Sequence, residues 1–343
     1  MSSFPLPALV SAAADPAAGD SIGTPLLWAV SIGAVLALVV MDFLATRRPH
    51  EVSMKEALGW SAFYLALPVA FGGYLWSRHG STIGVEYYTG YLVEKSLSVD
   101  NLFVFMLLLA AFAVPKELQQ RVLLIGVVGA LALRGVFIAL GAQLLKTFDW
   151  TFLLFGLILL ATGLKLLKDA VRGTDHQIDI DQMRTVRLLR RFMPVSEKYH
   201  CTAMTVRENG RRALTPLALV TVAILATDIV FAVDSVPAVY GITGDPYLVF
   251  ATNAFALLGL RALYFVLEGA LSRLVHLGFG LAAILGFIGV KLVLHWAHGV
   301  WPSTPEIPTL ASLGVILAIL GIVTVTSLAA TRAPGDSDAA RSG

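Results

Sequence analysis

Long uninterrupted runs of apolar residues recur along the chain, separated by short polar segments. Each run has about the 20 residues that a helix needs to cross the hydrocarbon core of a bilayer. Apolar residues follow one another rather than alternating with polar ones, so the runs predict helices and not the strands of a barrel. We place nine spans at 26–45, 57–76, 84–114, 121–145, 148–168, 214–239, 246–268, 275–297 and 308–330. The predicted fold is an all-α, polytopic membrane helix bundle.

Composition supports a membrane protein and excludes several other classes. Hydrophobic residues make up 57% of the 343 residues and charged residues 14%, whereas an ordinary soluble domain is about 25% charged. The near balance of 25 Lys and Arg against 23 Asp and Glu excludes an overall basic nucleic-acid binder. The single cysteine, Cys201, excludes an internal disulfide and a thiolate metal cluster.

The loops divide the chain and orient it. Most basic residues lie in alternate loops, above all in 169–213. The positive-inside rule therefore predicts a plasma-membrane protein with its amino terminus outside and its carboxyl terminus in the cytoplasm. We expect a single transmembrane domain over 24–331. Residues 1–23, which show no cleavable signal peptide, are predicted to be a disordered extracytoplasmic tail, and 332–343 a cytoplasmic tail.

The 169–213 loop contains an acidic stretch, 175–181, followed by several arginines. One interpretation is a regulatory metal site or a contact with anionic lipid headgroups. The other, which we favour, is a solvated cytoplasmic loop, because the positive-inside rule already accounts for its basic residues.

Most charges inside the spans form two matching series. Glu94-Lys-Ser-Leu-Ser-Val-Asp100-Asn101 parallels Asp228-Ile-Val-Phe-Ala-Val-Asp234-Ser235. In the following spans Arg134 parallels Arg261, and Lys165 parallels Lys291. The repeat unit is three helices, 84–168 and 214–297, and because three is odd the second copy enters the membrane from the opposite side. Such a three-plus-three inverted repeat is typical of secondary transporters, and it leaves the spans 26–45, 57–76 and 308–330 peripheral.

The four repeated acids need a reason to lie in the membrane. A charged side chain at a helix centre costs about 2.5–3.5 kcal/mol, so four cost on the order of 10 kcal/mol. Ser98 and Asn101 share a helical face with Glu94, as Ser235 does with Asp228. Pro237 favours a break in its span that would free backbone carbonyls. The four acids could line one cavity if the two helices are neighbours or are interrupted.

Carboxylates, amides and hydroxyls form an oxygen-rich set that suits Mg²⁺, Ca²⁺ or Mn²⁺. The alternative is that the acids only neutralise Arg134 and Arg261 in structural ion pairs, but four acids exceed two arginines. The principal candidates for cation binding are Glu94, Asp100, Asn101, Asp228, Asp234 and Ser235. Secondary candidates are Asp42, Ser98, Arg134, Asn253 and Arg261.

The two acidic segments, 94–105 and 227–238, resemble the signature segments of the TerC family, and 253–265 is similar to that family's next span. Matches at 47–57 and 206–212 extend the resemblance to roughly residues 35–330. It implies a membrane protein of the LysE transporter superfamily, a family named for tellurium resistance with members associated with Mn²⁺ export and metal homeostasis. It also implies that the four acids handle the cation. Many members carry a Glu where this chain has Leu225, which leaves ion identity and coupling open.

The leading hypothesis is a secondary transporter that exports a divalent cation, with Mn²⁺ first, through carboxylates that could also carry protons. Its partners would be the lipid bilayer, the metal ion and protons, with no nucleic acid, no permanently bound cofactor and no enzymatic reaction. An alternative is a membrane scaffold in a stress or protein-insertion complex that contacts partners through the 169–213 loop. A third class, an intramembrane aspartyl hydrolase using Asp100 and Asp234, is disfavoured because no glycine-flanked aspartate lies within a span.

Overall fold

Helices occupy all nine of the apolar runs, as the sequence predicts. The computed structural model describes residues 21–45, 53–172, 187, 194–196, 199, 203–208, 211–267 and 276–332. The helices are α1 (Pro25–Ala45), α2 (Met54–His79), α3 (Ser81–Ala111), α4 (Lys116–Thr147), α5 (Thr151–Arg172), α7 (Pro216–Tyr240), α8 (Pro246–Leu258), α9 (Leu260–Leu267), α10 (Leu277–Val300) and α11 (Thr309–Arg332).

Eight segments of the described chain are long and apolar enough to cross a membrane, with α8 and most of α9 counted together as Pro246–Val266. The remaining helix is α3, whose 31 residues include Glu86, Glu94, Lys95 and Asp100. It contacts α2, α7, α8, α10 and α11, so neighbouring helices surround it and its charges can face protein rather than lipid. With α3 as the ninth span, the fold is the predicted polytopic membrane bundle.

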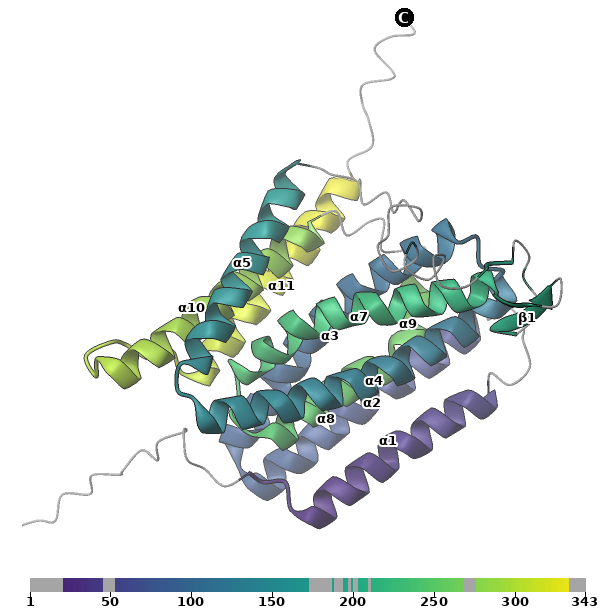
Figure 1. The fold of residues 1–343 in the computed structure, drawn as a ribbon. Coiled ribbons are helices and arrows are strands. Elements are labelled where there is room, and N and C mark those ends of the chain that lie inside the picture. The colour runs from purple at the N-terminus through teal and green to yellow at the C-terminus, as the bar shows by residue number, and fades with distance from the viewer. Residues whose placement is uncertain are drawn as a thin grey trace, which may run out of the picture.

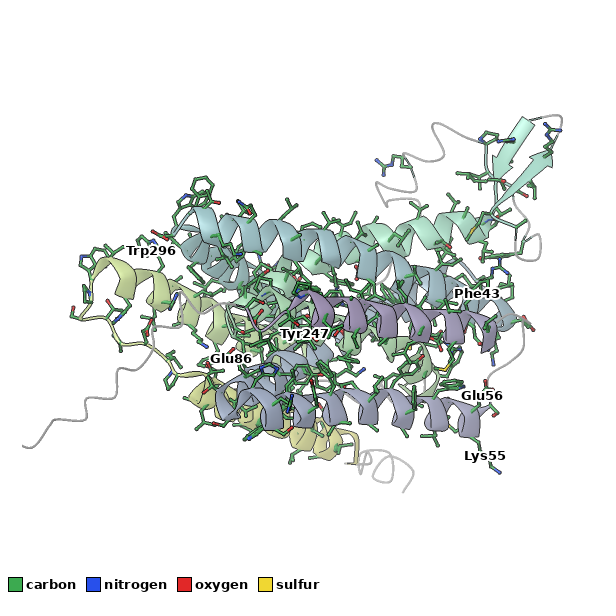
Figure 2. The ribbon with its side chains drawn as sticks, turned by 90° about the horizontal axis from the view of Figure 1, so that it is seen from below. Phe43, Lys55, Glu56, Glu86, Tyr247 and Trp296 are labelled. Atoms are coloured by element: carbon green, nitrogen blue, oxygen red, sulfur yellow. The ribbon has the colours of Figure 1, made fainter. Side chains whose placement is uncertain are left out.

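The strands β1 (Thr205–Glu208) and β2 (Arg211–Leu214) form an antiparallel hairpin. We call the end of the bundle that carries it the hairpin end (Figure 1). Figure 2 shows Phe43, Lys55 and Glu56 toward this end, and Glu86 and Trp296 toward the opposite end. The sequence predicts only a loop over 169–213, where the structure has this hairpin. The acidic stretch 175–181 of that loop lies outside the described residues.

The two predicted repeats correspond to α3–α4–α5 and α7–α8–α9–α10. Contacts between them follow a two-fold pattern: α3 lies against α8 as α4 lies against α7, and α5 lies against α10. Exchanging the two units maps these pairs onto one another, as an inverted repeat requires. In Figure 1, α5, α10 and α11 group on one side of the bundle, and α1 runs along another side.

The α5–α10 contact is the most extensive between any two elements, and glycines bring the two backbones together. A Cβ atom on Gly156 would lie 2.9 Å from the Gly289 carbonyl oxygen, and one on Gly289 would lie 3.0 Å from that of Gly156. Small residues allow this approach in membrane helices, where close packing takes the place of hydrophobic burial.

Caps and prolines set where the second repeat begins and breaks. The Thr215 hydroxyl caps α7 by accepting from the Ala218 N–H at 3.3 Å, and Pro216 stands at a first-turn position, where its missing N–H costs nothing. The predicted break at Pro237 is wrong, because α7 continues to Tyr240. Pro237 removes one hydrogen bond from the helix, and it is buried among neighbouring helices, where a membrane helix tolerates such a loss. Among the described residues, the helical spans of the second repeat are interrupted instead at Gly259, between α8 and α9.

Candidate functional site

Arg134 of α4 lies at the centre of a buried polar group. Its guanidinium forms an ion pair with Glu94 of α3. A second ion pair joins Nη2 to Oδ1 of Asp228 of α7 at 3.6 Å. All three side chains are at most 1% exposed. Because Glu94 and Asp228 hold the same position in the two repeats, one arginine joins the first acid of each repeat.

Two amides complete this group. The Asn253 oxygen of α8 accepts a hydrogen bond from Arg134 Nη1 at 2.9 Å. The Asn101 amide, oriented to satisfy its neighbours, accepts from Arg134 Nη2 at 3.1 Å and donates to the Leu97 carbonyl at 3.0 Å. We call Glu94, Asn101, Arg134, Asp228 and Asn253 the central cluster.

The central cluster and the neighbouring Ser98 contain more oxygen acceptors than the protein satisfies. The carboxylate oxygens of Glu94 and Asp228 are buried and, among the described residues, have no hydrogen-bond partner beyond their ion pairs with Arg134. The Ser98 hydroxyl, one helical turn from Glu94, is likewise buried without a partner in the described chain. The Ser235 hydroxyl is also buried without such a partner, but it lies about 10 Å further along α7 than Asp228, beside Asp234. Buried polar groups are usually satisfied, so oxygens in this number fit a small cation that takes oxygen ligands.

The second acid of each repeat stands apart from the central cluster. Six residues of helix span about 9 Å, and α3 runs toward the hairpin end while α7 runs away from it. Asp100 is therefore displaced toward the hairpin end from Glu94, and Asp234 toward the opposite end from Asp228. Both are partly exposed, and Asp234 accepts a hydrogen bond from the Thr162 hydroxyl of α5 at 2.7 Å.

The four acids therefore do not gather around one point, as a single cavity would require. Within the described part of the chain, no group of three or more His, Cys, Asp or Glu residues could hold a metal ion. Two acids meet at Arg134, and one further acid lies on each side along the membrane normal.

Arg261, the repeat counterpart of Arg134, is held differently. It donates two hydrogen bonds to Asp42 of α1, from Nη2 at 2.7 Å and from Nε at 3.2 Å. A third goes from Nη1 to the Gln120 side-chain oxygen at 3.0 Å. Asp42 is thus the ionic partner of Arg261 near the hairpin end, and the two arginines do not share the four repeated acids.

Three polar contacts are not predictable from the sequence pattern. Thr162 and Gln120 are ordinary in the sequence, and only the fold brings them to Asp234 and Arg261. Lys95 lies inside the quoted acidic motif, yet its side chain reaches the main-chain oxygen of Ala256 in α8 at 3.2 Å. The position of Lys95 next to a repeated acid is the one feature of the sequence that could have indicated its role.

Leu225 stands on the same face of α7 as Asp228, three residues before it, and lies against Gly129 of α4. Gly129 is five residues before Arg134. A carboxylate at position 225 would thus enter the α4–α7 interface close to the central cluster, where this chain has an apolar side chain.

The chain matches the family described as "Integral membrane protein TerC family" over residues 79–334. An uncharacterized membrane protein of Myxococcus xanthus is 39% identical over 93% of this chain and 97% of its own length. One from Mycobacterium tuberculosis is 40% identical over 92% of this chain and 82% of its own length. The protein named "Putative membrane-bound redox modulator Alx" in Escherichia coli is 39% identical over 88% of this chain and 94% of its own length. No solved structure matches.

Proposed function

The chain belongs to the TerC family of integral membrane proteins, and we propose that it is a secondary transporter that exports a divalent cation, Mn²⁺ first. The observation that carries the proposal is the meeting of Glu94 and Asp228 at Arg134. The first acid of each inverted repeat is buried there together with unsatisfied oxygens. In inverted-repeat carriers the substrate site lies where the repeats meet, near the bilayer midplane.

In the proposed cycle, Arg134 is the counter-charge of the empty carrier. When a divalent cation enters, the carboxylates of Glu94 and Asp228 turn from the guanidinium to the ion. The amide oxygens of Asn101 and Asn253, which already accept from Arg134, then keep the arginine satisfied. The ligands are oxygen atoms, which favour Mn²⁺, Mg²⁺ or Ca²⁺ over metals that prefer thiolate and imidazole.

Asp100 and Asp234, the second acids of the two repeats, would lie on the transport path on opposite sides of the central cluster. Lys55 lies toward the hairpin end (Figure 2), as do the basic residues of the hairpin itself. By the positive-inside rule this end would be the cytoplasmic side of the plasma membrane, with the amino terminus outside. Asp100 would then receive the cation on the cytoplasmic side, and Asp234 would release it on the outer side. The two repeats would open alternately toward these acids.

Protons are the proposed coupling ion. The two carboxylates of the central cluster carry two negative charges, which one divalent cation or two protons balance equally. Exchange of one cation for two protons therefore leaves the charge of the site unchanged. The proposed carrier needs no bound cofactor and catalyses no covalent reaction. Its contribution to metal homeostasis, and through it to tellurium resistance, would follow from the export.

The test is Mn²⁺ flux into proteoliposomes driven by a pH gradient. Glu94→Gln and Asp228→Asn should each reduce the rate at least tenfold. Glu117→Gln and Asp149→Asn remove exposed acids outside the bundle core and should transport as the unchanged protein does. If the protein transports no divalent cation, or if the two central variants match the two controls, the carrier proposal is wrong. A scaffold acting through the 169–213 loop would then be favoured.

A further inference from the structure

Lys95 places a positive charge at the end of a helix inside the membrane. It follows Glu94 in α3, but its Nζ donates to the Ala256 carbonyl oxygen at 3.2 Å. Ala256 is two residues before the end of α8. The last four carbonyls of a helix have no partner within it, and they carry the negative end of the helix dipole. The ammonium thus lies where a bound cation would be stabilised.

The interruption that exposes this carbonyl depends on Gly259. Its N–H bonds to the Leu257 oxygen instead of continuing the helical pattern to Phe255. A Cβ atom on Gly259 would lie 2.9 Å from the Tyr64 Cβ and 3.4 Å from the Lys95 Nζ. The absence of a side chain therefore makes room for both neighbours.

The equivalent contact on the other side of the two-fold relation, between α7 and α4, has neither feature. The counterpart of Gly259 is Ala132, which lies inside the unbroken helix α4, and the counterpart of Lys95 is Ile229. The helix break at Gly259 and the lysine therefore occur together at the α3–α8 contact and are both absent from the equivalent α7–α4 contact.

The surroundings of Lys95 supply oxygens but no ionic partner. Among the described residues, no carboxylate forms an ion pair with it, because the adjacent Glu94 is turned to Arg134. Tyr91, one helical turn earlier on the same face of α3, buries a hydroxyl that has no hydrogen-bond partner in the described chain. That hydroxyl is a candidate second oxygen ligand for an ion in place of the ammonium.

We propose that the junction of α8 and α9 is a monovalent-cation site, which the ammonium of Lys95 fills as a tethered ion. Carbonyls freed at broken membrane helices bind Na⁺ in the same way. Because the lysine supplies the charge permanently, the unchanged protein needs no sodium ion at this junction. The inference concerns stability and ion binding, so it stands or falls independently of Mn²⁺ transport.

The test removes the ammonium and offers free cations in its place. Lys95→Met and Lys95→Ala are purified as full chains in detergent. Their thermal unfolding midpoints are then measured in choline chloride, NaCl and methylammonium chloride at equal concentration. We expect both variants to unfold at a lower temperature than the unchanged protein in choline. The midpoints should rise and saturate with Na⁺, and in the alanine variant with methylammonium, which fits the space of the missing side-chain end.

Two matched variants separate the site from general effects of salt. Lys168→Met removes an exposed lysine of α5 and should show no preference for Na⁺ over choline. Lys95→Arg keeps the charge and should be as indifferent to Na⁺ as the unchanged protein. If the midpoints of Lys95→Met and Lys95→Ala respond to Na⁺ no more than that of Lys168→Met, the tethered-ion proposal is overturned. It is also overturned if neither variant can be recovered folded in Na⁺ or in methylammonium, because these ions should restore the missing charge.

Discussion

Replacing Arg134 by methionine tests whether the central cluster is held together by a charge that a metal ion can replace. The substitution keeps an unbranched apolar stem and removes the guanidinium, which leaves Glu94 and Asp228 buried without their counter-charge. Breaking a buried ion pair by removing one partner costs about 3–5 kcal/mol. Arg134 also donates to Asn253 at 2.9 Å. We therefore expect the free energy of unfolding to fall by about 5 kcal/mol in the absence of divalent cations.

Mn²⁺ should reverse much of this loss, because it can neutralise both carboxylates. A ligand at about 100 times its dissociation constant stabilises the folded state by about 2.7 kcal/mol. The matched control is Arg261→Met, the same change at the equivalent position of the second repeat. It breaks the contacts with Asp42 and Gln120 and should also destabilise, but it leaves one acid rather than two, so Mn²⁺ should restore little.

The assay is unfolding in mixed micelles with increasing SDS, with and without Mn²⁺. Choline chloride at matched ionic strength controls for general salt effects. If Mn²⁺ restores the two arginine variants equally, the effect does not depend on the paired acids, and Glu94 and Asp228 are not the site that Mn²⁺ occupies. Failure of Mn²⁺ to restore Arg134→Met would also count against this site, and would favour a purely structural ion pair.

Three further substitutions test separate parts of the structure. Gly156→Val should separate α5 from α10, because its Cβ would lie 2.9 Å from the Gly289 oxygen. The free energy of unfolding should fall by about 1–3 kcal/mol. An unchanged SDS midpoint would contradict this contact. Thr162→Val removes the hydroxyl that donates to Asp234. It should lower the free energy of unfolding by about 1 kcal/mol and slow Mn²⁺ release in the flux assay. If both the stability and the release rate match those of the unchanged protein, the contact is dispensable. Leu225→Glu adds an acid near the central cluster and should raise Mn²⁺ affinity and steepen its dependence on pH, measured by titration at several pH values; an unchanged affinity would place position 225 outside the site.

The helices and their repeat were predictable because they rest on strong, local signals. A helix in a bilayer must be long and apolar, and the few charges left inside the spans fall at matching positions of the two repeats. The close approach of Glu94, Asp228 and Arg134 could also be expected, since all three are charges that must be buried together if they are buried at all.

The partners of those charges could not be read from the sequence. Arg261 could have paired with any of the repeated acids, and only the packing of α1 against the bundle assigns it to Asp42. Asn253 is 119 residues from Arg134, and no local pattern links the two. Nor does residue type reveal that α7 continues through Pro237, or that Gly259 interrupts the next span.

The four acids are spread along the membrane normal, whereas the sequence pattern allowed all four to line one cavity. A shared six-residue spacing in two inverted helices sends the second acids, Asp100 and Asp234, in opposite directions. The spacing that suggested four ligands around one ion instead describes a central pair with one acid toward each side of the membrane.

Direct titration of Mn²⁺ onto the purified protein tests whether Glu94 and Asp228 form a cation site. We expect saturable binding of one ion per chain, lost in Glu94→Gln and in Asp228→Asn and retained in Glu117→Gln and Asp149→Asn. Mn²⁺ binding that survives in both central variants, or that is absent from the unchanged protein, would contradict the assignment of Glu94 and Asp228 as the cation site.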